Sequence, residues 1–204
     1  HFDSTSFNTS DSLNVGQFGF EVILHEVGHA LGLKHPFEAP KLPTAENTQH
    51  NTVMSYTSNH INDTDLKLFD IAALQYLYSV NTTLHADDSQ HGFNEQYIED
   101  GAGNDVFNAV EQTANVTVDL NQGGWSFIGN KHSSILAAGQ TFIGYGSWLE
   151  AAITGTGNDT LIGNYLDNSL TGGSGNDTLI GGLGSDELIG GTGADEYRLS
   201  EGDG

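Results

Sequence analysis

The sequence contains no cysteine, only three prolines and only five Lys and Arg residues among its 204 residues. Without cysteine the chain cannot be held together by disulfides, and bound metal is the usual substitute in a small extracellular domain. The scarcity of Lys and Arg argues against nucleic acid and anionic membranes as partners, because both need clustered basic side chains. No apolar run approaches the ~20 residues of a membrane-spanning helix, so we expect no membrane insertion.

Acidic residues and glycine are what the sequence has in excess. It has 27 Asp and Glu residues, 27 glycines and a formal net charge of −22. This balance favours cations as ligands, and the glycines of the C-terminal part recur periodically. Because the first residue is His1 and the last residues are Glu201 to Gly204, both ends look cut. We therefore expect a segment of a longer protein.

Two stretches in the N-terminal part have the periodicity of helices. Apolar residues recur at helical spacing over 17–31 and predict a helix there, with Gly32 as the glycine that follows its end. A similar pattern predicts a second helix over about 65–78, with Asp63 or Thr64 as its N-cap. The stretch between the two helices contains all three prolines and is predicted to be loop.

The character of the sequence changes after the second helix. Helical spacing ends, glycine becomes frequent, and short apolar pieces such as 116–118 and 142–143 alternate with turn residues. We place a boundary between residues 80 and 92. The expected domains are 1–83 and 84–204.

The first predicted helix carries an extended histidine motif. Residues 25–35, His-Glu-Val-Gly-His-Ala-Leu-Gly-Leu-Lys-His, match H-E-x-x-H-x-x-G-x-x-H at every fixed position. A helix places His25 and His29 on one face, and Gly32 can turn the chain so that His35 returns as a third ligand. Three histidines leave an open coordination position, which is typical of a catalytic rather than a structural zinc.

Glu26 follows the first of these histidines and can reach a water molecule without being a ligand. We expect it to take the proton of that water and to pass it to the leaving amine. Zinc would make the water more acidic and polarise the scissile carbonyl. The remaining histidines lack ligand spacing and are interpreted as surface or core residues: His50, His60, His85, His91 and His132.

A turn that contains the single methionine follows the histidine motif. Val53-Met54-Ser55-Tyr56 and the later Asp-Ile-Ala-Ala-Leu-Gln-Tyr-Leu-Tyr of 70–78 resemble the serralysins, secreted bacterial metallopeptidases of the metzincin class. The resemblance implies that Met54 forms a floor under the zinc site. It also implies that Tyr56 is a further zinc ligand, which can swing away during turnover. Tyr56 could then donate a hydrogen bond to the oxyanion.

Five nonapeptides run without a gap from residue 154 to residue 198 and match G-G-x-G-x-D-x-U-x, where U is apolar. Each x-U-x is predicted to be a three-residue strand with only the U side chain pointing inward, and each glycine-rich part a tight turn. Two nonapeptides then make one coil, so that turns two repeats apart stack on the same edge. The U positions are Leu161, Leu170, Leu179, Leu188 and Tyr197.

Oxygen ligands would gather where these turns stack, which indicates calcium. The sixth positions are Asp159, Asp177 and Asp195 on one edge and Asn168 and Asp186 on the other. Resemblance to RTX β-rolls implies that carbonyls of the second and fourth positions complete the calcium sites. These carbonyls belong to Gly155, Gly157, Asn164, Leu166, Gly173, Gly175, Gly182, Gly184, Gly191 and Gly193.

Two positions next to or within this array depart from its pattern. Asn168 offers an oxygen without a charge, so we expect weaker calcium binding there. Glu150 stands nine residues before Asp159, and together with Gly146 and Trp148 it would supply one more half-coil with calcium ligands.

An isolated earlier copy of the turn, Asp-Gly-Ala-Gly-Asn-Asp, also resembles serralysins and makes Asp100 and Asp105 candidate calcium ligands. In that family a Thr-Gly-Arg-Asp-type loop just upstream completes the calcium site. Here Gly-Phe-Asn of 92–94 runs almost directly into Tyr-Ile of 97–98, and that loop is missing. The site at Asp100 and Asp105 therefore lacks one of its expected parts.

The resemblance covers the chain from about Phe18 to Gly204 and implies an α+β protein. A metzincin-like helical lower half of a zincin catalytic domain, residues 1–83, would precede an all-β parallel β-roll (RTX) domain, residues 84–204. The implied protein is a monomeric, secreted, extracellular bacterial metalloendopeptidase that hydrolyses the peptide bonds of proteins. It would use Zn²⁺ and Ca²⁺ and leave the cell through a type I secretion machinery.

A function of another class stays open, namely a calcium-binding RTX adhesin or interaction module with a non-functional zinc site. Zinc content together with a peptidase assay on the full-length protein separates the two. The intact set of zinc-site residues argues against a relic: His25, Glu26, His29, His35 and Tyr56.

Overall fold

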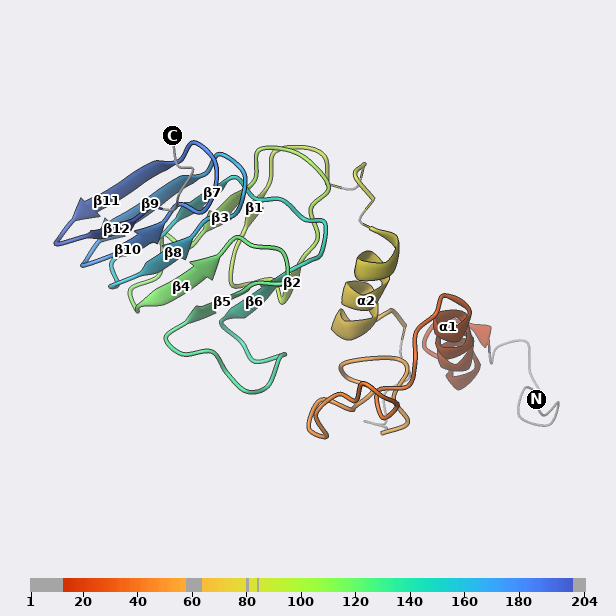
Figure 1. Cartoon of the computed structure of the whole chain (residues 1–204). Coiled ribbons are helices and arrows are strands. Elements are labelled where there is room, and N and C mark those ends of the chain that lie inside the picture. The colour runs from red at the N-terminus through yellow and green to blue at the C-terminus, as the bar shows by residue number, and fades with distance from the viewer. Residues whose placement is uncertain (1–12, 58–63, 80, 84, 200–204) are drawn as a thin grey trace. The chain divides into compact units, whose positions relative to one another are not determined.

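The computed structural model describes residues 13–57, 64–79, 81–83 and 85–199 of the chain. Two compact units, His1–Tyr78 and Ser79–Gly204, make up the chain. Both helices of the described residues lie in the first unit. All of the described strands lie in the second unit (Figure 1). The described chain is therefore mostly β, with few helices. The boundary between the two units lies at Tyr78, where the second helix ends.

The first helix, α1 (Phe18–Ala30), ends on a backbone motif that needs glycine. Gly32 has a φ of +94°, and its N–H donates to the carbonyl of His29 at 3.0 Å. The N–H of Leu33 donates to the carbonyl of Gly28 at 3.0 Å. These two hydrogen bonds form a Schellman motif, in which the residue after the C-cap is left-handed. The chain reverses here as the sequence predicted, and Leu33 turns back toward the helix.

The second helix, α2 (Leu68–Tyr78), begins later than the sequence predicted. Thr64 is not its N-cap, because its hydroxyl donates to Asp65 instead at 2.9 Å; Asp63 lies outside the described residues. The carboxylate of Asp70, in the first turn, accepts the backbone N–H of Lys67 at 2.9 Å. The start of α2 is thus fixed by Asp70, which also makes the long-range contacts described next.

Asp70 joins α2 to the turn that contains Met54. One carboxylate oxygen of Asp70 accepts the hydroxyl of Thr52 at 2.6 Å, and the other accepts the N–H of Val53 at 2.9 Å. All three residues are buried, so this network holds the turn against the helix. The small core of this unit consists of Leu33, Val53 and Met54, with Leu66, Ala73 and Leu74 packed against it.

The described residues of the second unit form two sheets. One sheet has the order β1-β3-β7-β9-β11, and the other has the order β12-β10-β8-β4-β5-β6-β2. All neighbouring strands are parallel except the pairs β4–β5 and β5–β6. The strands are β1 (Gln90–His91), β2 (Tyr97–Ile98), β3 (Val106–Asn108), β4 (Val116–Asp119), β5 (Trp125–Ile128), β6 (Gln140–Ile143), β7 (Ala151–Ile153), β8 (Thr160–Ile162), β9 (Ser169–Ser174), β10 (Thr178–Ile180), β11 (Glu187–Thr192) and β12 (Glu196–Arg198).

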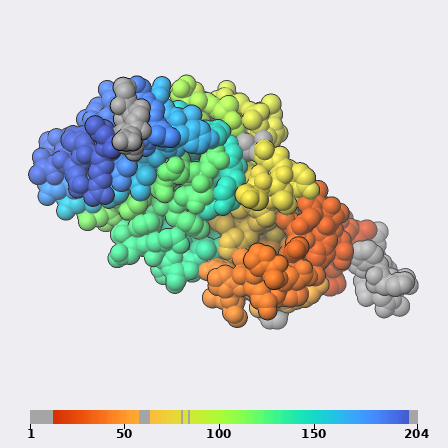
Figure 2. Space-filling model, viewed as in Figure 1, coloured from red at the N-terminus to blue at the C-terminus, as the bar shows by residue number. Residues whose placement is uncertain are grey.

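The strands from β7 to β12 alternate between the two sheets, so two nonapeptides make each coil of a β-roll. Strands two repeats apart pair in register, as Leu161 with Leu179 in one sheet and Leu170 with Leu188 in the other. The last repeats, in dark blue, lie at one end of the roll (Figure 2). Most strands have three residues as expected, but β9 and β11 have six because they continue into the next glycine-rich turn.

The core of the roll lies between the two sheets. The U residues Leu161, Leu170 and Leu179 are fully buried, and their neighbours in the same strands are half-buried. Burial decreases toward the last coil, where Leu188 is partly buried and the Tyr197 side chain is 49% exposed. None of the described helices is long and apolar enough to cross a membrane.

Candidate metal centres

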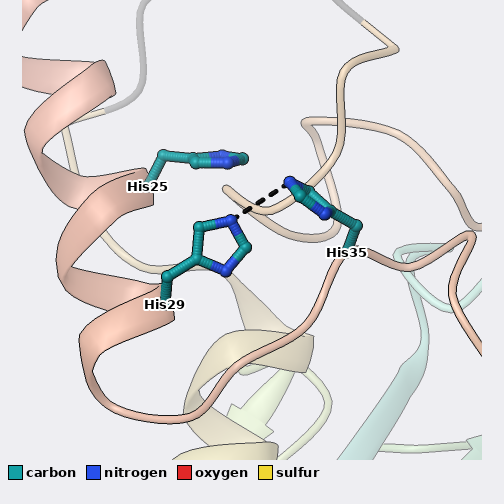
Figure 3. A group of neighbouring side chains, drawn as sticks. All are labelled: His25, His29 and His35. Carbon is teal, nitrogen blue, oxygen red and sulfur yellow. Dashed lines mark hydrogen bonds between the residues drawn. The ribbon is translucent and has the colours of Figure 1, made fainter. Parts of the chain in front are cut away.

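Three histidines of the first unit point into one small space (Figure 3). His25 and His29 lie one turn apart on α1, and His35 lies on the segment that returns after the Gly32 reversal. One ring nitrogen from each lies within 4.8 Å of the others, and the Nε2 atoms of His29 and His35 are 3.1 Å apart. Two Zn–N bonds of about 2.0–2.1 Å at a tetrahedral angle place their nitrogens about 3.3 Å apart. The three histidines therefore fit a zinc ion.

The other ring nitrogen of each histidine is held by a hydrogen bond. Nδ1 of His25 donates to the carbonyl of Val53 at 2.8 Å, and Nδ1 of His29 donates to the carbonyl of Leu33 at 3.0 Å. Nδ1 of His35 donates to the carboxylate of Glu38 at 2.9 Å. Such outer contacts fix the tautomer that leaves Nε2 available to a metal. The hydrogen bond from His35 also holds the pKa of Glu38 below its ordinary value.

Tyr56 reaches the same space from the turn that contains Met54. Its hydroxyl oxygen lies 2.7 Å from Nε2 of His35, and its ring stacks on that of His25 at a centroid distance of 5.4 Å. The Tyr56 side chain is 66% exposed, so it has room to move. The structure thus brings the hydroxyl to the side of the three nitrogens, where a further ligand or a hydrogen-bond donor would act.

Met54 lies beneath the helix that carries the histidines. It is almost fully buried and packs with Leu33 and Val53. A Cβ on Gly28 would lie 2.5 Å from the Met54 sulfur, so only glycine permits this approach. Glu26 is exposed on α1, next in sequence to His25. Of the sequence candidates for this centre, the structure brings His25, His29, His35 and Tyr56 together.

The calcium candidates form two columns along the roll. The first column, in the seven-stranded sheet, contains Asp159, Asp177 and Asp195, which stand two residues before the paired strand centres of β8, β10 and β12. The second column, in the five-stranded sheet, contains Asp105, Glu150, Asn168 and Asp186, which stand two residues before the paired centres of β3, β7, β9 and β11. Asp105 therefore belongs to the roll, although it precedes the tandem repeats by almost fifty residues.

Each column is built as a ladder of hydrogen bonds. In the first column one carboxylate oxygen of Asp177 accepts the N–H of Asp159 at 2.8 Å, and one of Asp195 accepts the N–H of Asp177 at 3.0 Å. In the second column Asp186 accepts the N–H of Asn168, and Glu150 accepts the N–H of Asp105, both at 2.8 Å. The ladders fix where each carboxylate points.

The second oxygen of several of these carboxylates is buried and lacks a hydrogen-bond partner within the described chain. These atoms are Oδ2 of Asp105, Asp159, Asp177 and Asp186. A buried carboxylate oxygen without a partner is costly unless a cation meets it. Burial raises the pKa of Asp159, Asp177 and Glu150 above ordinary values. The donor chemistry therefore fits a hard divalent cation such as calcium.

The candidate carbonyls stack in the same way as the carboxylates. A Cβ on Gly173 would meet the carbonyl oxygen of Gly155, and one on Gly191 would meet that of Gly173. The carbonyls of the fourth position stack in the same way, because a Cβ on Gly175 would meet the carbonyl oxygen of Gly157. Gly173, Gly175 and Gly191 have positive φ, so both the left-handed backbone and the close approach require glycine there. The carbonyl of Gly155 also accepts the N–H of Ser174 at 2.9 Å, which leaves its second lone pair for a cation.

Asn168 differs from the carboxylates of its column. Its side-chain oxygen accepts the N–H of Asn164 at 2.7 Å. Its amide nitrogen lies 3.3 Å from the carbonyl of Leu149 and 3.2 Å from that of Glu150, to which it donates. Asn164 also donates to the Leu149 carbonyl. In this half-coil, hydrogen bonds between protein groups thus satisfy polar atoms that a cation would satisfy in the other half-coils.

A ladder of asparagines at the fifth repeat position was not anticipated from the sequence. The side-chain oxygen of Asn115 accepts the N–H of Asn158, that of Asn158 accepts the N–H of Asn176, and that of Asn176 accepts the N–H of Ala194. On the other edge, a side-chain oxygen of Asp167 accepts the N–H of Ser185 in the same way. The recurrence of Asn before Asp in two repeats was the available signal.

His91, interpreted from the sequence only as a surface or core residue, lies in a second cluster with Asp100 and Asp105. Burial alone would lower the pKa of His91, but its hydrogen bonds to Glu95 and Asp100 raise the pKa to about 8. Burial and the charges of Asp100 and Glu150 raise the pKa of Asp105 to about 6. Among the other histidines, His60 lies outside the described residues.

Comparisons with known proteins bear on both units. The RTX calcium-binding nonapeptide repeat matches residues 152–165 and 162–197. The chain is 34% identical over 203 residues to serralysin of Photorhabdus luminescens, which covers 82% of this chain and 40% of that protein. It is 33% identical over 197 residues to serralysin of Proteus mirabilis, and this alignment covers 80% of this chain and 38% of that protein. This chain is serralysin-type. It is also 34% identical over 205 residues to metalloprotease AprA of Pseudomonas entomophila, and this alignment covers 82% of this chain and 41% of that protein.

The serralysin-type chain spans about 40% of the length of the curated relatives that it matches. An alignment over 82% of the chain is longer than Ser79–Gly204, so it extends from the roll into His1–Tyr78. The likeness therefore includes part of the unit that carries the histidine cluster. The RTX match supports calcium as a ligand of the roll.

Proposed function

We propose that residues 1–83 belong to the catalytic domain of an extracellular zinc metalloendopeptidase and that residues 84–204 form its calcium-binding roll. One observation carries the proposal. His25, His29 and His35 direct their Nε2 atoms into one space, while each Nδ1 is hydrogen-bonded to a fixed oxygen. Histidines that merely filled a core would not need this common orientation.

The roles of the side chains follow from this arrangement. The three histidines hold the ion, and zinc when bound supplies a Lewis acid that acidifies water and polarises a carbonyl. Glu26 accepts the proton of the attacking water and returns it to the leaving amine. The Tyr56 hydroxyl donates a hydrogen bond to the oxyanion that develops on the peptide carbonyl. Met54 supports the helix from below and keeps the histidines in place.

Calcium gives the roll its stability in this proposal. Buried carboxylate oxygens along both columns have no hydrogen-bond partner among the described residues, and the strands are too short to hold a sheet unaided. Extracellular modules bind calcium with a Kd of about 10⁻⁴–10⁻³ M, so such a roll folds outside the cell rather than in a cytosol. Secretion by a type I machinery, a protein substrate and a monomeric state complete the proposal.

The test uses the full-length protein with calcium present. It should cleave a quenched fluorescent peptide, lose activity on zinc chelation and regain it on zinc addition. His29→Gln should abolish activity at every zinc concentration, whereas the matched control His50→Gln, an exposed histidine of the same unit, should retain it. Full activity in His29→Gln would rule out the assigned centre.

The second candidate is a calcium-dependent RTX adhesin or interaction module whose zinc site does not function. The exposure of Glu26 on α1 and the open surroundings of Tyr56 are the observations compatible with it. A full-length protein that binds zinc at the three histidines and yet cleaves no peptide in a broad library would favour this candidate over the peptidase.

A further inference from the structure

The roll contains a coil that the nonapeptide pattern does not reveal. β4 pairs with β8 so that Val118 is in register with Leu161, just as Leu161 is in register with Leu179 of the tandem repeats. Val118 is completely buried, as Leu161 is. The turn at 111–116 therefore stacks on the turn before β8, at the start of the first column. Residues 111–119 thus form a half-coil, although they contain no glycine and no acid at the sixth position.

The hydrogen bonds of the tandem turns recur at this hidden half-coil. Oδ1 of Asp159 accepts the N–H of Val116 at 2.8 Å, and the carbonyl of Gln112 accepts the N–H of Thr156 at 3.1 Å. The ladder of asparagines begins in the same turn, at Asn115. The bond to the aspartate carboxylate joins residues 18 apart in the tandem repeats but 43 apart here. The insertion of β5 and β6 after β4 conceals the repeat in the sequence.

An apolar side chain replaces the acid of this turn. Val116 stands two residues before Val118, where the sixth position of a nonapeptide would be. Its side chain is 2% exposed and belongs to the core of the roll. The space between this turn and the next therefore receives a carboxylate from Asp159 alone, whereas the following space lies between Asp159 and Asp177. The hidden half-coil is thus attached by hydrogen bonds and apolar contacts that need no cation.

Buried amides hold the second column at the same level of the roll. The amide nitrogen of Asn168 donates to the carbonyls of Leu149 and Glu150, at 3.3 and 3.2 Å. The amide nitrogen of Asn164 donates to the carbonyls of Leu149 and Leu120, at 3.0 and 3.2 Å. Asn168 is 2% exposed and Asn164 is 4% exposed. Neutral donors therefore satisfy these buried carbonyls, and the hydrogen bonds do not depend on calcium.

The later coils are built differently. Oδ2 of Asp177 and Oδ2 of Asp186 are buried and have no hydrogen-bond partner among the described residues. Apolar burial also decreases there, because Leu188 is only partly buried and Tyr197 is 49% exposed. Without a cation, these coils would combine unsatisfied buried carboxylates with a thin core. They therefore depend on calcium more strongly than the coil that precedes them.

We propose that residues 111–171 fold without calcium and form a template on which calcium folds residues 172–198. β8 and β9 are the last strands of this template, and β10 and β11 pair with them in register. Each added coil brings its carboxylates against the turn already in place, where calcium offsets their charge, and so each coil depends on its neighbour. In the template alone, Asp159 lies at the open end, where water can meet its free oxygen. The proposal rests on calcium as the ligand of the roll.

Hydrogen–deuterium exchange of the whole chain tests this order of folding without any substitution. Amide exchange is followed by mass spectrometry in excess chelator and in millimolar calcium. Peptides from 116–119 and 160–171 should exchange about a hundredfold more slowly than an unfolded chain in both conditions, whereas peptides from 178–198 should be protected only in calcium. Equally fast exchange of 160–171 and 178–198 in chelator would overturn the proposal and leave the role of calcium intact. Full protection of 178–198 in chelator would overturn both.

Asn168→Asp tests the role of the buried amide. The substitution replaces a neutral donor by a negative charge, so in chelator residues 145–171 should lose their protection. Millimolar calcium should restore the protection, and native mass spectrometry should count about one more calcium ion per chain than in the unsubstituted protein. Protection of 145–171 that survives Asn168→Asp in chelator would overturn the assignment of the amide as the replacement for a cation.

Asn176→Asp is the matched control for this variant. Asn176 is exposed, and the substitution retains the side-chain oxygen that accepts the N–H of Ala194. It adds the same charge to the roll as Asn168→Asp but removes no buried donor. It should therefore change neither the protection of 145–171 in chelator nor the number of bound calcium ions. An equal loss of protection in both variants would assign the effect to added charge and overturn the role of the amide.

Discussion

The sulfur of Met54 occupies the position where a side chain on Gly28 would stand, since a Cβ on Gly28 would lie only 2.5 Å from it. Gly28 is one of the unspecified positions of the histidine motif, between Glu26 and His29. The packing of Met54 beneath the helix that carries the proposed zinc ligands therefore depends on a single helical glycine. This contact leads to the first prediction.

Gly28→Ala should destabilise the first unit and weaken zinc binding, although alanine is a better helix former than glycine. Overpacking of this kind costs about 1–3 kcal/mol, which outweighs the helix-propensity gain of about 1 kcal/mol. Thermal unfolding and zinc affinity are the measurements. Val27→Ala, at an exposed neighbouring position, is the control and should change neither. A Gly28→Ala chain with raised stability and unchanged zinc affinity would contradict the packing argument.

Glu26→Gln should leave zinc bound in the full-length protein and lower kcat by about 10²–10⁴-fold, because only the proton acceptor is removed. Zinc content and turnover of a fluorescent peptide are measured on the same sample. Glu38→Gln is a useful comparison, since Glu38 contacts His35 from outside the cluster and should affect zinc affinity more than turnover. Activity within a few fold of the unsubstituted protein would show that another group acts as base.

Tyr56→Phe should lower kcat by about 10²–10³-fold with little change in KM, because the lost hydrogen bond acts mainly in the transition state. The stacking of the ring on His25 is retained in phenylalanine, so the fold should not change. Steady-state kinetics separate the two parameters. An effect confined to KM would place Tyr56 in substrate binding instead.

Asp177→Asn should raise the calcium concentration needed to fold the roll, on the order of tenfold, because ligand charge sets calcium affinity. Asparagine keeps the hydrogen bond to the N–H of Asp159 but removes the charge. Asp167→Asn is the matched control, since the fifth position already accommodates Asn158 and Asn176. Circular dichroism during a calcium titration measures both. Equal midpoints for the two variants would argue against Asp177 as a ligand.

The metal-free roll should lose stability as the pH rises from about 4 to about 8. The pKa of Asp105 is raised to about 6 and that of His91 to about 8 in the folded chain. A group whose pKa is higher when folded contributes its full stability below its unfolded pKa and loses it as the pH passes its folded value. Urea unfolding of the metal-free chain at several pH values gives the slope. Stability that increases with pH across this window would show the opposite linkage.

Local sequence patterns were sufficient for the features that depend on neighbours in the chain. The i, i+4 spacing of His25 and His29 fixes a common helix face, and Gly32 ends the helix by a local reversal. The nonapeptide period fixes which side chain of each strand points inward, as Leu161 and Leu179 show. Each of these follows from backbone geometry over fewer than a dozen residues.

Tertiary structure decided the features that depend on which distant segments meet. Asp70 sets the start of α2 because Thr52 and Val53 bond the same carboxylate, which no local pattern near residue 65 could reveal. Tyr197 has the same repeat phase as Leu179, yet it is exposed because no described coil covers the last strand.

His91 shows the same division most clearly. The sequence gives it no ligand spacing, and its nearest partner in the chain is Glu95. Only the pairing of β1 with β3 brings its ring to Asp100 and Asp105 and buries all three together. The sequence by itself determined the extended histidine motif and the period of the roll, because both depend on the spacing of residues that are close together in the chain. The chemistry at the start of the roll was decided by strand pairing, because burial and charge there arise from residues that meet only in the fold.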